Sequence, residues 1–103
     1  MPISGDQYEF SDDNIDKSPD KHGVYALFDG SELIYYGRAD GKGVTIRSRL
    51  RDHKDGREGK CTEKATLYKR EVTNDAADRE VELLKEYKQR HKKLPRCNEV
   101  MPT

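Results

Sequence analysis

The stretch GVYALFDGSELIYYG, residues 23–37, decides the fold of this chain. Residues 23–28 and 32–36 are rich in aromatic and aliphatic side chains of the kind that favours strands. Between them, Asp29-Gly30-Ser31 is a turn signal, and Gly37 closes the second run. The two runs therefore predict a β-hairpin.

Downstream of the hairpin, a glycine-rich loop over 40–43 leads into a predicted helix from about 44 to 54. Residues 55–63 are polar, contain two glycines and predict a loop. The run 65–72 alternates in the manner of a third strand.

A second, longer helix is predicted from about 76 to 92, with a capping sequence at 73–75 before it and Pro95 after it. The order of elements is therefore β-β-α-β-α. We expect an α+β fold in which helices flank a three-stranded, mostly antiparallel sheet.

The formal net charge is zero, but the charges are unevenly distributed. Residues 1–20 carry six acids and one base, whereas residues 21–103 carry 19 bases and 14 acids. We expect residues 1–17 to be an acidic, partly disordered segment with a short helix after Ser11, and 18–103 to form the domain. A basic body suits phosphate binding, so deletion of 1–17 should tighten DNA binding; a mixed, solvated surface is the alternative.

The composition is that of one small domain with a thin core, since only 32% of the 103 residues are apolar and 39% are charged. No apolar stretch approaches the roughly 18 residues of a membrane span, and there is no signal-peptide pattern. The expected location is the cytoplasm.

Cys61 and Cys97 belong to no CxxC pair. Together with His53 and His91 they could in principle hold zinc, but the spacing does not favour a zinc-stabilised adaptor. We expect two free thiols.

The second helix contains an anomaly, because Glu80 lies in the middle of its apolar face, whereas Glu82 points away. A carboxylate in that position must pair with a base, bind a metal or lie at the rim of the packed region. In the first helix, Arg49 and His53 are four residues apart and share one side. An arginine suits phosphate oxygens and a histidine can transfer a proton, although such a pair is often surface decoration.

Taken together, these features resemble the GIY-YIG nuclease superfamily. The residues that carry the resemblance span about 18–98: Gly23-Val24-Tyr25, Tyr35-Tyr36-Gly37, Ile46-Arg47-Ser48-Arg49-Leu50, the helix with Glu80, and Pro95-Arg96-Cys97-Asn98. Val24 and Tyr36 replace isoleucines of the nominal motif, and the spacing from Gly37 to Arg49 is longer than in the repair incision domain.

The resemblance implies an endonuclease that hydrolyses DNA phosphodiester bonds with one Mg²⁺, for which Mn²⁺ could substitute. Tyr25 would act as general base or orient the water, and Tyr35 would hydrogen-bond nearby. Arg49 would stabilise the phosphate, His53 would assist, and Glu80 would ligate the metal. The residues expected to bind the substrate are Arg38, Lys42, Arg47 and Asn98.

Two conditions follow for the tyrosines. Neighbouring cations must lower the pKa of Tyr25, because an ordinary phenol is a poor base at neutral pH. Side chains alternate along a strand, so Tyr25 and Tyr35 share a face only with an odd-numbered hairpin loop or a β-bulge. Otherwise both rings simply pack in the sheet.

The partners implied are DNA and either a separate targeting protein or a second copy of the chain in a homodimer. The alternative function is a non-catalytic nucleic-acid-binding or protein-interaction module that retains the GIY-YIG fold.

Overall fold

A computed structural model describes residues 2–99 and 101 of the chain. Its elements, in chain order, are β1 (Tyr8–Glu9), α1 (Asp12–Asp16), β2 (Gly23–Asp29), β3 (Glu32–Ala39), α2 (Ile46–Lys54), α3 (Lys60–Glu63), β4 (Leu67–Val72) and α4 (Ala76–His91).

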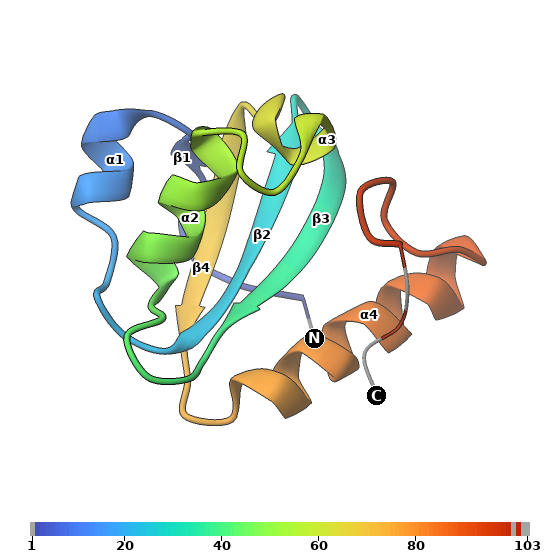
Figure 1. Cartoon of the computed structure of the whole chain (residues 1–103). Helices are drawn as coiled ribbons and strands as arrows, with labels where there is room; N and C mark the ends of the chain where they lie inside the picture. The colour runs from blue at the N-terminus through green and yellow to red at the C-terminus, as the bar shows by residue number, and fades with distance from the viewer. Residues whose placement is uncertain (1, 100, 102–103) are drawn as a thin grey trace.

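The four strands of the described residues form one antiparallel sheet in the order β1-β4-β2-β3 (Figure 1). This confirms the predicted α+β class, but the sheet has one strand more than the three predicted. The additional strand, β1, pairs Tyr8 with Tyr68 of β4. A two-residue strand carries no periodic signal, so the sequence could not reveal it.

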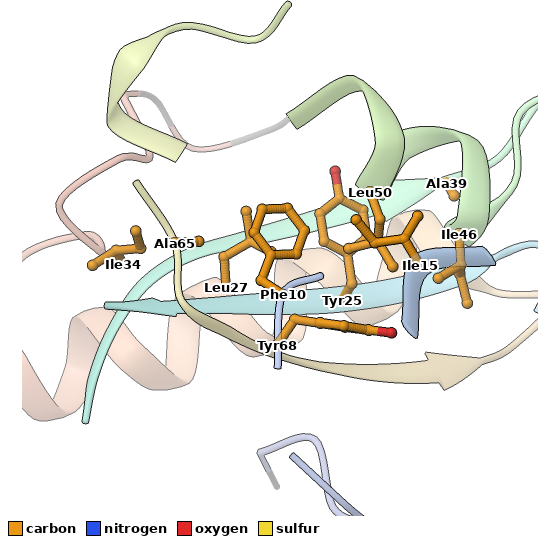
Figure 2. Packing of buried hydrophobic residues seen from close by; sticks show 10 residues of the cluster. All are labelled: Phe10, Ile15, Tyr25, Leu27, Ile34, Ala39, Ile46, Leu50, Ala65 and Tyr68. Atoms are coloured by element: carbon orange, nitrogen blue, oxygen red, sulfur yellow. The ribbon is translucent and has the colours of Figure 1, made fainter. Parts of the chain in front are cut away.

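Helices cover both faces of the sheet: α1 and α2 pack on one face and α4 on the other (Figure 1). The alternation of β2 explains the two layers, since Tyr25 and Leu27 belong to one buried cluster and Val24 and Ala26 to the other. Figure 2 shows the first cluster between the sheet and α2.

The hairpin contains the β-bulge that the sequence argument required. Asp29 pairs with Glu32 across a two-residue turn, and the register then shifts, so that Phe28 faces Leu33 but Leu27 faces Tyr35. Ile34 is the extra residue. The bulge leaves Tyr35 on the face of Tyr25 and sends Tyr36 into the opposite cluster.

Helix α2 begins directly after its capping residue, Thr45. Thr45 caps α2 by accepting a hydrogen bond from the Ser48 backbone, and the Ser48 side chain accepts one from the Thr45 backbone in return. The predicted polar loop over 55–63 contains a short helix, α3, which places Thr62 beside the end of α2.

The acidic N-terminal segment packs against the rest of the fold. Phe10 and Ile15 are buried in the same cluster as Tyr25, and the expected helix after Ser11 is present as α1. Arg51 of α2 forms ion pairs with Asp12 and Asp16. Deletion of 1–17 would therefore remove core side chains as well as charge, and its expected effect on DNA binding is better tested by neutralising the acids.

No helix within 2–99 combines the length and the apolar character that a membrane crossing requires.

We predict that Ile15→Ala destabilises the protein by about 3 kcal/mol, because it leaves a cavity at a fully buried position. Asp13→Ala, in the same helix but exposed, should cost less than about 0.5 kcal/mol. Chemical denaturation measures both. Equal effects of the two substitutions would mean that the N-terminal segment does not pack as described.

Candidate functional site

The candidate site lies at the β3 edge of the sheet, where side chains from α2, α3, α4 and the C-terminal segment converge. Two adjoining depressions of about 500 and 560 Å³ share Tyr35 and Glu80 in their walls. His53 lines the first depression and Arg49 the second. Four of the five predicted catalytic residues therefore border one cleft.

Tyr25, the fifth, stands behind the cleft wall and is fully buried. Its ring centroid lies 6.2 Å from that of Tyr35. The phenol lies over Gly37, its partner across the strands: a Cβ at Gly37 would come within 2.4 Å of the Tyr25 hydroxyl and 2.7 Å of the Tyr35 ring. Glycine is required at this position because the aromatic side chains approach the backbone so closely.

A buried chain of hydrogen bonds joins Tyr25 to α3. The Tyr25 hydroxyl lies 2.7 Å from Nε2 of His53, and Nδ1 of His53 lies 2.8 Å from the Thr62 hydroxyl. The His53 ring also contacts Tyr35, at a centroid distance of 5.0 Å. No pattern in the sequence indicated Thr62, because its position depends on where the four-residue helix α3 folds back.

Burial governs the acid–base properties of this chain. It raises the pKa of Tyr25 well above the ordinary value; Tyr35 raises it further and Arg49 only partly offsets the effect. Burial and the charge of Arg49 lower the pKa of His53 to about 4. At neutral pH Tyr25 is thus a protonated phenol and His53 a neutral imidazole, so the condition set by the sequence argument, a lowered pKa for Tyr25, is not met.

Arg49 is already engaged by carboxylates. It lies 2.8 Å from Glu58 and 3.6 Å from Asp52. Burial opposes its charge, but Tyr25 and Glu58 outweigh this and raise the pKa of Arg49, while the hydrogen bond from Arg49 lowers the pKa of Glu58. Glu58 was not predicted; it lies in the turn between two glycines of positive φ, Gly56 and Gly59.

Glu80 lies on the buried face of α4, as its position in the sequence predicted, and is only 8% exposed, whereas Glu82 is exposed. Its ion-pair partner among the described residues is Arg38, at 3.9 Å. Burial raises the pKa of Glu80, with Arg38 acting in the opposite direction. A carboxylate this poorly compensated is suited to a further cation.

The residues predicted to bind substrate are not all brought to the cleft. Arg38 lines it, but Lys42 is an exposed loop residue outside the two depressions. The Nε of Arg47 donates a hydrogen bond to the carbonyl of Ser18 at 2.9 Å and so ties α2 to the segment before β2.

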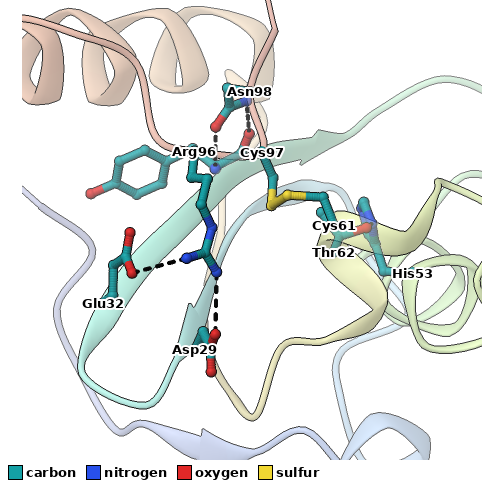
Figure 3. Close-up of a disulfide and its surroundings, with 9 residues drawn as sticks. Asp29, Glu32, His53, Cys61, Thr62, Arg96, Cys97 and Asn98 are labelled. Atoms are coloured by element: carbon teal, nitrogen blue, oxygen red, sulfur yellow. Dashed lines mark hydrogen bonds and ion pairs between the residues drawn. A yellow bond between two sulfur atoms is a disulfide. The ribbon is translucent and has the colours of Figure 1, made fainter.

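Asn98 borders the cleft, but its amide bonds to the backbone of β3. Its Oδ1 accepts from the Tyr36 N–H and its Nδ2 donates to the Tyr36 carbonyl, each at 3.0 Å (Figure 3). The N–H of Cys97 donates to the Ile34 carbonyl. The C-terminal segment therefore covers the open edge of the strand that carries Tyr35, and Asn98 has a structural role here.

The prediction of two free thiols is wrong, because Cys61 and Cys97 form a disulfide (Figure 3). The chain brings α3 and the C-terminal segment together at the edge of β3, which the 36-residue separation in sequence did not indicate. The bond lines the first depression and joins Cys61, next to Thr62, to Cys97, next to Asn98.

The walls of the cleft carry more carboxylates than bases among the described residues. The acids are Asp40, Asp52, Glu58, Glu80 and Glu99, and the bases are Arg38, Arg49 and Lys60. An anionic substrate therefore needs an added cation or the displacement of a carboxylate to enter.

Comparisons of the chain with protein-family models, with curated proteins and with solved structures found no match. The likeness to GIY-YIG nucleases consequently rests on the residues named above.

The lowered pKa of His53 predicts a pH-dependent stability. In the unfolded chain His53 has an ordinary pKa near 6.5, whereas in the folded chain its pKa is about 4. As the pH falls from 7, the unfolded chain therefore binds this proton before the folded chain does. Stability should therefore fall by about 1 kcal/mol between pH 7.0 and 5.5 because of this residue. Urea unfolding at both pH values measures the loss.

The His53→Gln variant should show a loss smaller by that amount, whereas His91→Gln, at an exposed position, should behave like the unchanged protein. A pH dependence that is the same in all three proteins would mean that His53 titrates normally in the fold.

Glu58 is predicted to compete with anions for Arg49. Glu58→Gln should tighten the binding of a short DNA duplex about threefold at low salt, because the guanidinium is released for phosphate. Fluorescence anisotropy measures the affinity. Glu63→Gln makes the same charge change on α3 and is the control; equal gains in both variants would show that only net charge matters.

Proposed function

We propose that this protein is a metal-dependent endonuclease that hydrolyses DNA phosphodiester bonds in the cleft at the β3 edge. The observation that carries the proposal is the convergence of Tyr35, Arg49, His53 and Glu80, from three different elements, on one cleft. The GIY-YIG resemblance of the motifs that supply these residues is its second support.

Arg49 is assigned to the phosphate. Its planar guanidinium can donate two parallel hydrogen bonds to phosphate oxygens and stabilise the charge that grows on them during hydrolysis. The carboxylate of Glu58 holds that position in the structure, so the phosphate must replace Glu58.

Glu80 is assigned to the metal, Mg²⁺ or in its place Mn²⁺. Within the described residues, no group of three or more His, Cys, Asp or Glu side chains is arranged to hold a metal ion. The assignment therefore uses Glu80 as the protein ligand, with water and phosphate oxygens completing the shell. The burial of Glu80 and the excess of carboxylates in the cleft fit this assignment. The metal, when bound, would offset the charge of the phosphate.

Proton transfer is assigned to the Tyr25–His53 pair. As the phenol oxygen takes a proton from the attacking water, the phenol gives its own proton to Nε2 of His53. The arriving phosphate anion favours the charged imidazolium and so raises the pKa of His53 from its low value. Tyr25 is buried, so this step requires the Tyr35 ring to move aside and admit the water.

A non-catalytic module that binds nucleic acid or protein is the second candidate. The specific observations in its favour are the Arg49–Glu58 ion pair and the burial of Tyr25. Nicking of supercoiled plasmid with Mg²⁺ or Mn²⁺, followed by a panel of branched, flapped, nicked and plain duplexes, separates the two. Binding without cutting in every metal and substrate would favour the module.

A targeting protein or a homodimer would supply the contacts that one small domain lacks. The cytoplasmic location expected from the sequence stays a prediction, and the Cys61–Cys97 bond weighs against it, because disulfides persist mainly in oxidising compartments.

Glu80→Gln is predicted to reduce metal-dependent cleavage by roughly 100- to 1,000-fold while the protein stays folded, because an electrostatic contact to the reacting groups is lost. Glu82→Gln is the matched control, at an exposed position two residues further along the same helix, and should cut normally. Initial rates of plasmid nicking measure both. If Glu82→Gln is the inactive variant, Glu80 is not the metal ligand.

A further inference from the structure

The Tyr25–His53–Thr62 chain gives both ring nitrogens of His53 a hydroxyl partner. All three side chains are at most 2% exposed. Each ring nitrogen of His53 has one partner, the Tyr25 hydroxyl at Nε2 and the Thr62 hydroxyl at Nδ1. A neutral imidazole has one N–H, so one nitrogen donates and the other accepts.

The environment of Tyr25 decides which nitrogen accepts. Tyr35, Arg49 and Glu80 also act on the Tyr25 hydroxyl, Tyr35 and Glu80 only through their charge. The guanidinium of Arg49 can donate a hydrogen bond to the phenol but cannot accept one from it. Within residues 2–99 the acceptor that remains for the phenol proton is Nε2 of His53. The imidazole proton must then be on Nδ1, where it is donated to Thr62.

Thr62 is itself held from two sides. It belongs to the four-residue helix α3, and its neighbour Cys61 is bonded to Cys97. The backbone N–H of Cys97 in turn donates to the Ile34 carbonyl of β3. The hydroxyl that faces His53 is therefore anchored to the strand that carries Tyr35, so a helix too short to be stable alone keeps its place.

We propose that Thr62 is a positioning residue that holds His53 as the Nδ1–H tautomer and aims the bare Nε2 at the Tyr25 hydroxyl. The tautomer assignment is argued from the hydrogen bonds of His53 and the surroundings of Tyr25, and it does not depend on the proposed function. The catalytic consequence, that Nε2 is ready to take the phenol proton, rests on the proposed nuclease function.

The direct test is the ¹⁵N NMR spectrum of the His53 ring in the 103-residue chain at pH 7. The unchanged protein and Thr62→Ser should show a protonated Nδ1 and an unprotonated Nε2. Thr62→Val keeps the side-chain volume but removes the acceptor, and should lower the ratio of Nδ1–H to Nε2–H tautomer about fivefold. Thr73→Val, the same change remote from the cleft, should leave the spectrum unchanged.

Two results would overturn the proposal: an Nε2–H tautomer in the unchanged protein, or the same ratio in Thr62→Val. The first reading needs no variant and so does not depend on whether Thr62→Val folds.

Cleavage assays separate this inference from the proposed function. Thr62→Val should lower kcat for plasmid nicking about tenfold with little change in KM, and Thr62→Ser should recover most of it. A tautomer shift in Thr62→Val combined with no nicking by any protein, the unchanged one included, would keep Thr62 as the positioning residue and remove the nuclease assignment.

Discussion

The β-bulge at Ile34 is the constraint on which the rest of the structure depends. Without the extra residue, the two-residue turn would place Tyr36 opposite Tyr25 and turn Tyr35 toward α4. With it, Tyr35 lies beside Tyr25 and His53 on one face, and Tyr36 fills the other core. The same shift leaves the Ile34 carbonyl to accept the N–H of Cys97, so the bulge also fixes the C-terminal segment.

The candidate site is assembled around an edge of the sheet rather than on one face. Glu80 comes from α4, which covers the face opposite to α2. It nevertheless borders the same depression as Tyr35 and Arg49, because no strand of the described residues lies beyond β3. The edge that admits these side chains is also an exposed row of backbone groups. The side-chain amide of Asn98 hydrogen-bonds to part of that row, which explains why Asn98 contacts the backbone of β3.

Burial is the main influence on the chemistry of the cleft. It keeps Tyr25 protonated and His53 neutral, and it raises the pKa of Glu80. Arg49 pairs with Glu58, whereas Arg38 lies 3.9 Å from Glu80 and compensates its charge only in part. Both arginines therefore have carboxylate neighbours before any phosphate or metal arrives. Binding of a phosphate therefore has to exchange one set of ion pairs for another.

The sequence by itself determined the hairpin, the long helix with Glu80 on its buried face and the need for a bulge, because strand alternation and helix periodicity are local geometric rules. Only the tertiary structure decided the fourth strand, the packing of the acidic segment, the Cys61–Cys97 bond and the partners of His53, Arg49 and Asn98. These depend on contacts between residues distant in the chain or on short turns without a periodic signal. The raised pKa of Tyr25 was also decided by the tertiary structure. The sequence shows which cationic residues are present, but not how deeply the phenol is buried.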